Sequence, residues 1–511
     1  MNVRDTSLLE LITNKAKRNN ITMTVLAKQC HISRATLYRY IQQTTPPPKS
    51  FFDKLITILQ LSEVEASMLQ QYYLAGGTSP YEIAFPALQH LLLERNSIIP
   101  FVIPNTEVLV FTAQDKTISS FSDIVQQINS ILEQESDYSV DMHIVGFTAP
   151  TYFILLQHVV SQLSHKTNHF TVEHLVSLPE DKPDEVIALI SNLFFLFPYN
   201  NYNVCYRECP STGPDDGIWS NTMLLKVQSN FDETKSMYFQ FSLYGNNQVQ
   251  CFHFNNNMSY FYLLNTYSHI RLQYTKSLVN YRNLVALNQK MIEFESDGVQ
   301  AIFKPDLRQN YIPPEAFRSM IKRINATSRH SLANSLFSMH VEASLVDAHL
   351  QQALTLLEHR YEDTFRSTHY VVCNIDGLRY LARAGTFMDK AISLPPFSKE
   401  ERILIFESLY KRVTNPDDSL KLVLLKPKIL PRGEIMIVNQ EKGALIAFGY
   451  ENVYRSCRNI LLNTPLVTEP FIDYAKHLYA KQQSETPMLC KNVLIDILQG
   501  LRMDRRKKPS F

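Results

Sequence analysis

The segment Met23–Ile41 constrains the fold more than any other stretch of the sequence. Two helices that cross closely need small or apolar residues at fixed offsets, and this segment has them on both sides of a short turn. The positions expected to face the partner helix are Leu26, Ala27 and Cys30 from the first helix, Ile32 at the turn, and Leu37 with either Tyr40 or Ile41 from the second. Ala27 marks the point of closest approach, where a larger side chain would separate the helices.

Five short helices are expected over residues 7–75. The proline run Pro46–Pro48 must be a loop because proline removes a backbone donor and clashes with the preceding turn. The helices are identified by apolar stripes and caps: Ser7 to about Arg18 with Leu8, Leu11, Ile12 and Ala16; about Thr22 to Cys30; a third from its N-cap Ser33; a fourth carrying Phe52, Leu55, Ile56 and Leu59; and a fifth from the capping box Ser62-x-x-Glu65 to Leu74. Gly76 and Gly77 end the last of these.

These residues resemble the helix-turn-helix of the Cro and phage-repressor class, the XRE family, over about residues 6–76. The sequence departs from the family at His31, which stands where the turn usually holds glycine. The residue at that position must accept a positive φ, which histidine tolerates better than a branched side chain does.

The resemblance implies that the second helix of the motif lies in the major groove of duplex DNA, which is wide enough to admit a helix. Arg34, Ala35 and Arg39 match positions that usually read base edges. Thr24, Ser33 and Lys49 match positions that usually hold phosphates. Thr36 stands beside Ser33 at the start of the helix, and Tyr38 is expected to add a phosphate or thymine-methyl contact. The alternative is a domain that keeps this shape and binds protein.

The charge distribution agrees with a polyanionic partner at the chain's ends. Residues 1–49 carry eight basic and two acidic side chains, a net charge of +6, and residues 502–511 carry five basic and one acidic, a net charge of +4. Because the whole chain has a formal charge of +1, residues 50–501 carry −9. A basic head and tail on an acidic body indicate that only the ends meet nucleic acid.

The remaining 430 or so residues read as a mixed α/β body. Helical periodicity covers Phe121–Leu132, Pro183–Leu196, Met258–Phe294, Glu315–Ile324 and Val346–Arg360. Strand patterns cover Val108–Thr112, His143–Gly146, Met237–Leu243, Val249–Phe254, Tyr370–Asn374, Leu420–Leu425, Ile435–Val438 and Ala444–Phe448, with a hairpin turn expected at Gly245-Asn246-Asn247.

Two stretches of the body echo each other. Residues 238–265 and 434–463 both read as a hairpin followed by a helix, which leaves open a duplicated α/β unit with a boundary near 295–310, or chance similarity. We therefore expect an all-α five-helix helix-turn-helix domain at 1–77, an α/β sensor or oligomerisation unit at 78–300, a second α/β unit at 301–501 and a basic tail at 502–511.

Other motifs are weak. Cys205, Cys209, Cys251 and His253 have poor spacing for zinc, so ordinary core cysteines are the better interpretation, and we expect no metal and no cofactor. The turns at Gly377 and Gly385 could shape a ligand site, although plain turns are the better interpretation. No phosphate-binding loop, nucleophile elbow or kinase signature is present, so we expect no catalytic residues and no enzyme activity.

The expected function is that of a sequence-specific transcriptional regulator. It would bind a double-stranded DNA operator as a homodimer and respond to a small-molecule or protein effector through the body. Two other classes stay open: a component of a defence or toxin–antitoxin module whose helix-turn-helix regulates its own operon, and a degenerate enzyme. The scattered cysteines, the polar N-terminus and the lack of a long apolar stretch favour a cytoplasmic location with no membrane contact.

Overall fold

The computed structural model describes residues 12–61, 81–92, 107–280, 293–337, 341–387, 394–425, 434–448 and 458–503, with short gaps inside the first four ranges. Its internal contacts divide the chain into two compact units. One is Ser97–Asn280, called here the middle unit. The other combines Met1–Asn96 with Tyr281–Phe511. Within the latter, residues 12–61 are called the N-terminal segment, and the α/β part from Tyr281 onward is called the C-terminal unit.

The N-terminal segment is built from short helices around a small core of its own. Its described helices are α2 (Met23–Gln29), α3 (Arg34–Ile41) and α4 (Lys49–Ile58), preceded by further helical positions between residues 12 and 17. The expectation of an all-α five-helix domain is therefore wrong as a description of this chain, which is mixed α/β with two multi-stranded sheets. Stripes of seven to ten residues predict short helices, but they do not establish a closed domain. The expected fifth helix, 62–74, lies outside the described residues.

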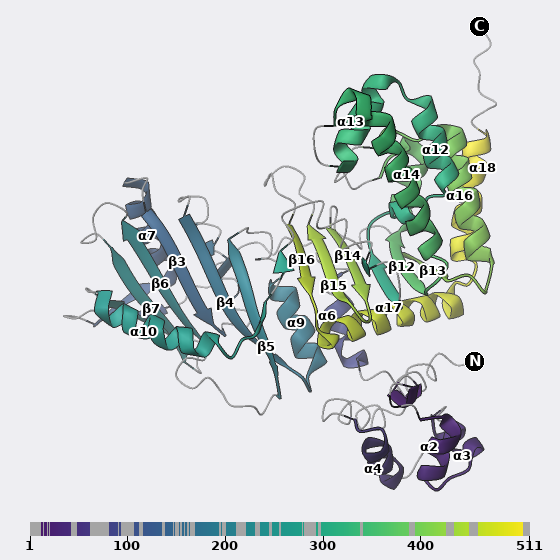
Figure 1. Cartoon of the computed structure of the whole chain (residues 1–511). Helices are drawn as coiled ribbons and strands as arrows, with labels where there is room; N and C mark the ends of the chain where they lie inside the picture. Colours follow the sequence, from purple (N-terminus) through teal and green to yellow (C-terminus); the bar gives the residue numbers. More distant parts are fainter. Residues whose placement is uncertain are drawn as a thin grey trace. The chain divides into compact units, whose positions relative to one another are not determined.

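The middle unit is a mixed sheet with helices beside it (Figure 1). Its elements are β1 (Glu107–Phe111), β2 (Lys116–Ser120), α7 (Phe121–Gln134), β3 (Tyr138–Val145), β4 (His169–Pro179), α9 (Pro183–Leu193), β5 (Tyr202–Cys209), β6 (Thr222–Ser229), β7 (Met237–Tyr244), β8 (Gln248–Phe254), α10 (Asn257–Arg271), β9 (Lys276–Ser277) and β10 (Val279–Asn280). The nine strands described in this sheet have the order β2-β1-β8-β7-β6-β3-β4-β5-β9.

Alternation along the strands of the middle unit separates two faces of the sheet. Val145, Leu175 and Leu224 face α10 and pack against Tyr260 and Tyr267 of that helix. Successive strand side chains point to opposite faces, so the intervening apolar residues pack on the other side. Along β3 and β4 the face away from α10 is fully buried, whereas the face toward α10 is buried only in part, because Asp141 and Glu173 on it are half-buried and Thr171 is exposed.

The C-terminal unit holds the second sheet. Its elements are β11 (Gln300–Phe303), η6 (Gln309–Tyr311), α12 (Pro314–Arg323), α13 (Ala326–Phe337), η7 (Ala343–Leu345), α14 (Val346–Asp363), β12 (His369–Asn374), α15 (Ile375–Ala384), α16 (Lys399–Thr414), β13 (Leu420–Leu425), β14 (Glu434–Asn439), β15 (Gly443–Phe448), β16 (Arg458–Leu462), α17 (Pro465–Glu485) and α18 (Leu489–Met503). Within this unit the strands follow the order β16-β15-β14-β11-β12-β13.

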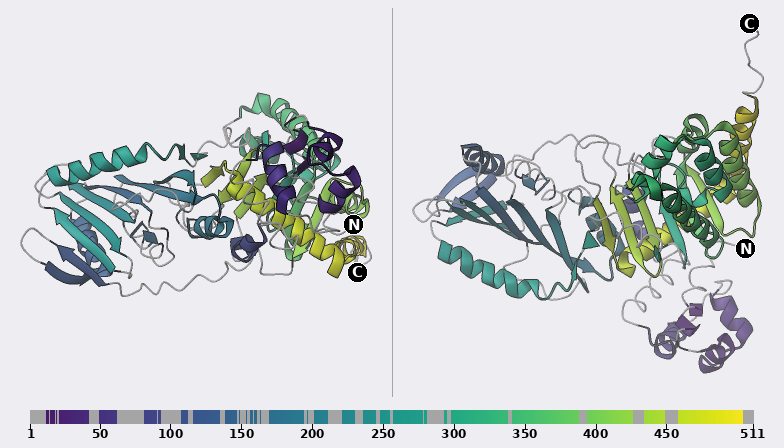
Figure 2. Two further views of the ribbon diagram at one scale, coloured as in Figure 1. Left: turned by 90° about the horizontal axis from the view of Figure 1, so that it is seen from below. Right: turned by 45° about the horizontal axis from the view of Figure 1, so that its top comes forward.

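Helices cover both faces of the second sheet (Figures 1 and 2). Ile302 and Leu422 belong to a core shared with α12, α16 and α18. The neighbouring residue Phe303 points the other way and contacts Phe471 of α17, with ring centroids 5.9 Å apart. Helix α17 crosses β11 to β15 on that face. The two short helices η2 (Glu82–Ala84) and α6 (Phe85–Gln89) pack against α17.

The two sheets share one topology. In the middle unit β3, β4 and β5 are parallel, and β6, β7 and β8 continue from β3 as an antiparallel meander that leads into α10. In the C-terminal unit β11, β12 and β13 are parallel, and β14, β15 and β16 continue from β11 in the same way and lead into α17. Six strands thus repeat in order and direction.

The sequence patterns gave two assignments in the body that the structure corrects. The expected helix over Met258–Phe294 ends at Arg271, because Lys276 and Ser277 pair with β5 as a short strand and a second short strand follows at 279–280. Residues 281–292 lie outside the described part of the chain. The expected helix at 451–463 contains a strand, β16, and the helix begins only at Pro465. The similarity between residues 238–265 and 434–463 is therefore displaced by one strand. By topology β14 corresponds to β6 and not to β7.

Candidate nucleic-acid interface

Helix α2 begins at a side-chain cap and ends at a left-handed turn. The Thr22 side chain accepts a hydrogen bond from the Val25 backbone at 3.3 Å and caps the first turn. After Cys30 the chain reverses at His31, whose φ of 58° confirms the positive value expected at this position. The Ile32 backbone then donates to the Ala27 carbonyl at 3.0 Å and closes the turn. Histidine thus occupies a left-handed position that glycine would fill without strain.

Helix α3 starts at a side-chain cap. The Thr36 backbone donates to the Ser33 hydroxyl at 3.0 Å, and the two hydroxyls lie 2.8 Å apart. This cap satisfies one of the first backbone amides, which the helix cannot pair internally. The Thr36 hydroxyl is consequently held by Ser33, so its expected contact with DNA competes with a bond inside the protein.

The inner faces of α2 and α3 meet as the pattern predicted. Leu26, Ala27, Cys30 and Leu37 are buried, and Ile32 and Tyr40 pack against them in part. The Tyr40 ring also meets the Phe51 ring of α4 edge-on at 5.0 Å. Burial raises the pKa of the Cys30 thiol, so this cysteine behaves as a neutral core residue.

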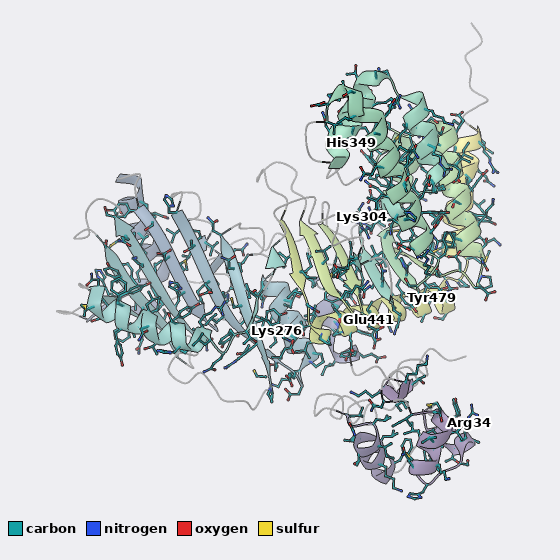
Figure 3. All side chains as sticks on the ribbon, in the orientation of Figure 1. Arg34, Lys276, Lys304, His349, Glu441 and Tyr479 are labelled. Atoms are coloured by element: carbon teal, nitrogen blue, oxygen red, sulfur yellow. The ribbon has the colours of Figure 1, made fainter. Side chains whose placement is uncertain are left out.

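The outer face carries part of the expected DNA-binding set. Thr24, Ser33, Arg34 and Ala35 are exposed, whereas Thr36 and Tyr38 are half-buried. The Arg34 guanidinium lies 5.6 Å from the centre of the Tyr38 ring, one helical turn away. Figure 3 shows Arg34 on the side of α3 away from α4.

Arg39 and Lys49 lie in α3 and α4, but their side chains are outside the described part of the structure. Their expected contacts with a base edge and a phosphate therefore stay predictions.

Two basic residues near the turn were missed by the sequence patterns. Lys28 is exposed in the last turn of α2, and the Lys54 ammonium of α4 donates to the Cys30 carbonyl at 3.4 Å. Lys54 therefore caps the end of α2 from another helix. Lys28 could have been found by its helical position, but the Lys54 contact joins residues 24 positions apart and depends on tertiary packing.

The weaker candidate sites are separated or structural. Cys205 is in β5 and Cys251 is in β8, with four strands between them. Neighbouring strands lie about 4.8 Å apart, so β5 and β8 are separated by roughly 24 Å. In the described part of the chain no cluster of three or more histidine, cysteine or acidic side chains could hold a metal. Gly385 ends α15 with a φ of 72°. A Cβ on Gly377 would lie 2.0 Å from the Pro305 carbonyl oxygen, so this glycine permits close packing.

The basic tail lies largely outside the described residues. Its first member, Arg502, pairs with Glu407 at 2.7 Å. Among the helices that the structure describes, none combines the length and apolar character needed to cross a bilayer.

Comparison with known proteins assigns no family. No family model matches the chain, and neither a curated protein nor a solved structure matches it significantly.

Proposed function

We propose that the chain is a sequence-specific regulator that binds duplex DNA through α3. The observation that carries the proposal is the arrangement of α2, the turn at His31 and α3. Its apolar inner face is buried, and its outer face presents Ser33, Arg34 and Ala35 to solvent. A short capped helix with a polar outer face has the dimensions that the major groove admits.

The exposed side chains on α2 and at the start of α3 can make different kinds of contact with DNA. An arginine side chain can form two hydrogen bonds with the O6 and N7 atoms of guanine, and Arg34 is available for that contact. Small hydroxyl residues such as Thr24 and Ser33 suit phosphate contacts that fix the register of the helix. The net charge of +6 over residues 1–49 supplies the nonspecific attraction to DNA.

The larger part of the proposal concerns regulation. A single domain of this size makes few DNA contacts, so we infer that a homodimer binds a symmetric operator inside the cytoplasm. The two α/β units then serve to assemble the dimer and to sense an effector that favours one arrangement of the DNA-reading helices.

The test uses the full-length protein and a random duplex library, from which bound sequences are selected and the best duplex is measured by fluorescence anisotropy. Arg34→Ala with Arg39→Ala is expected to weaken binding of the selected duplex by about 1–3 kcal/mol for each lost base contact. Lys49→Ala is expected to weaken all duplexes alike and to lower the salt slope by about one.

A matched control is available on α15, where the Arg379 side chain is 58% exposed. Arg379→Ala removes the same charge from a surface with no part in the proposal, and it should leave DNA binding unchanged. If the double variant retains wild-type affinity and selectivity, α3 is not the reading helix and the proposal fails.

A further inference from the structure

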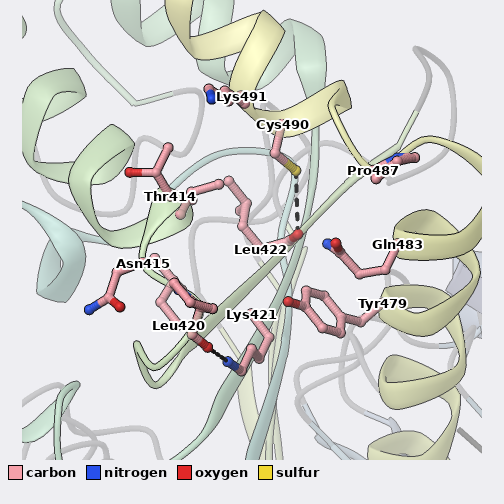
Figure 4. A pocket seen from close by; sticks show the side chains of 12 residues that line it. Thr414, Asn415, Leu420, Lys421, Leu422, Tyr479, Gln483, Pro487, Cys490 and Lys491 are labelled. Atoms are coloured by element: carbon pink, nitrogen blue, oxygen red, sulfur yellow. Dashed lines mark hydrogen bonds between the residues drawn. The ribbon is translucent and has the colours of Figure 1, made fainter. Parts of the chain in front are cut away.

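The polar groups around a cavity in the C-terminal unit do not converge on one point. The cavity has a volume of about 280 Å³ and is bounded by β13, the end of α16, the second half of α17 and the start of α18 (Figure 4). Its lining contains Lys421 and Lys491 and no acidic residue. Lys421 donates to the Pro416 carbonyl at 3.1 Å, and Lys491 lies on the opposite side of the cavity from Tyr479. This lining therefore defines no ligand.

Helix α10 of the middle unit has two sides of different character. It lies along one face of its sheet, on the outside of the unit (Figures 1 and 2). Tyr260 and Tyr267, seven residues apart, are buried and fix its inner side. On the outer side the residues at the same spacing are exposed: Met258, Asn265 and, just beyond the end of the helix, Leu272.

Further exposed residues make the outer side of α10 a continuous stripe. All members of this stripe are exposed, and they are called here the α10 seam: Met258, Phe261, Tyr262, Asn265, Ser268, His269 and Leu272. They follow the a, d and e positions of a seven-residue repeat, which is the pattern of a helix that packs along another helix.

The α10 seam is apolar and uncharged. Met258 is 74% exposed, Tyr262 75%, Leu272 74% and Phe261 46%. No aspartate, glutamate, lysine or arginine occurs over residues 257–270, although these types make up 19% of the chain. Aromatic residues and methionine are enriched in the core of protein interfaces, where charged residues are depleted. The composition of the seam is therefore that of an interface and not that of a solvated helix face.

The lack of charge restricts the partner of the α10 seam. Nucleic acids and anionic membrane surfaces are bound largely through lysine and arginine, which the seam does not have. A charged peptide would find no side chain there for an ion pair. The partner must be an uncharged surface with apolar groups at matching intervals, and a second copy of the seam meets both requirements.

The α10 seam is also symmetric about its middle residue. Asn265 lies seven residues from Met258 and seven from Leu272. A two-fold axis through Asn265 makes two such helices antiparallel and brings Met258 of one copy opposite Leu272 of the other. The same axis brings Phe261 opposite His269 and places the two Asn265 amides together, where each can donate to the other.

The area of the α10 seam is sufficient for a specific contact. Large side chains such as the aromatic ones bury about 150–250 Å² each when they are fully covered. The exposed parts of Met258, Phe261, Tyr262 and Leu272 then amount to roughly 500 Å² in one copy and roughly 1,000 Å² in two, the lower limit for a specific interface. Because these side chains are exposed in the single chain, changing them should alter association and not the stability of the monomer.

We propose that two copies of this chain form an antiparallel, two-fold symmetric dimer through the α10 seam. Asn265 lies on the axis, and Met258 packs against Leu272 of the second copy. The dimer itself does not rest on the proposed function, whereas its role in DNA binding does: the two-fold axis sets the spacing of the two DNA-reading helices on a symmetric operator.

The test of the dimer is sedimentation equilibrium of the full-length protein over a series of micromolar concentrations. Wild type should dimerise, and Met258→Lys should raise the dimer dissociation constant at least about tenfold, because each dimer would bury two unpaired ammonium groups. Met503→Lys is the matched control, since Met503 of α18 is 69% exposed and lies outside the seam, and it should dimerise like wild type.

Two further variants test the antiparallel register. Leu272→Glu added to Met258→Lys should restore the dimer, because each lysine then faces a glutamate of the other copy. Within one chain the two positions are about 21 Å apart and cannot pair. Asn265→Cys should form a disulfide-linked dimer under mild oxidation, whereas Asn492→Cys, at an exposed position of α18, should not.

Three results would overturn the dimer: a wild type that is monomeric throughout, a Met258→Lys variant that dimerises like wild type, or no restoration by Leu272→Glu. Binding of a monomeric wild type to phosphatidylcholine vesicles, lost in Met258→Lys, would assign the seam to lipid instead.

The role of the dimer in DNA binding is tested with the selected duplex. Met258→Lys should bind it more weakly than wild type, and Leu272→Glu in the same chain should restore the affinity. Equal affinities of wild type and Met258→Lys would overturn this role. If no duplex binds to any variant, the proposed function fails, and sedimentation still decides whether the dimer exists.

Discussion

The middle and C-terminal units use the same six-strand topology but cover it in different ways. In the C-terminal unit, α17 buries much of its length, including Leu466, Val467 and Phe471. The topologically equivalent α10 buries only Tyr260 and Tyr267 among its residues. It instead leaves the large apolar side chains of Met258, Phe261 and Tyr262 in solvent, as does Leu272 just beyond its end.

The polar groups under the two helices differ as well. Beneath α10, Glu173 of β4 accepts hydrogen bonds from Tyr267 at 3.0 Å and from Arg271 at 2.8 Å. Beneath α17, the Phe303 and Phe471 rings make an apolar contact. One topology therefore accommodates either a polar network or an apolar core, and the difference should appear as unequal stability of the two helices.

The largest expected effect follows from truncating the apolar contact. Phe471→Ala should destabilise the C-terminal unit by about 3–5 kcal/mol, because a fully buried phenylalanine leaves a cavity when it is removed. Phe261→Ala, on the half-exposed surface of α10, should cost about 0.5 kcal/mol or less. Urea titration followed by hydrogen-exchange mass spectrometry distinguishes the units by their peptides. Equal costs would contradict the contrast between α10 and α17.

Lowering the pH from above 6.5 to below 4 is expected to destabilise the middle unit by about 3 kcal/mol. Burial lowers the pKa of His174 to about 4, and its ring lies between the Tyr202 hydroxyl and the Gly146 carbonyl. Because the unfolded chain takes up this proton near pH 6.5, the contribution is complete above that pH and is lost as the pH falls toward 4. His174→Gln should flatten the pH dependence of unfolding of residues 97–280. An unchanged slope would show that His174 is not responsible.

The smallest expected effect separates two tyrosines of α10 by sign. Tyr267→Phe removes a hydrogen bond to the Glu173 carboxylate and should destabilise the middle unit by about 1 kcal/mol. Among the residues that the structure describes, the buried Tyr260 hydroxyl has no hydrogen-bond partner, so Tyr260→Phe should be neutral or stabilising. Urea midpoints of the two variants provide the measurement. A loss of stability in Tyr260→Phe would mean that its hydroxyl has a partner.

The local assignments were predictable where one short pattern contained all the information. The burial of Leu26, Ala27 and Leu37 and the positive φ at His31 follow from spacing within a few helical turns. Strands such as β7, β12 and β15 were expected for the same reason, because each alternates or runs apolar over five or more residues. The expectation of a closed five-helix domain was wrong because these short patterns predict single helices and not how the helices assemble.

Other parts could not be predicted because their causes are distant in sequence. The shared topology depends on β14 pairing with β11 and β6 pairing with β3, and the echo of residues 434–463 misplaced that correspondence by one strand. The Gln482 side chain of α17 hydrogen-bonds to the edge strand β13 at Leu424, 58 positions earlier in the chain. No periodicity within a short window reports such contacts.

The sequence by itself determined the α2–turn–α3 pattern, the basic character of the N-terminal residues and many of the strands, because side-chain spacing and charge are properties of neighbouring residues. Only the tertiary structure decided which strands pair, that α10 stays half-exposed where α17 is buried, and that a cationic cavity opens beside β13. These features depend on which distant surfaces exclude water from each other, and that choice is made by the whole folded chain.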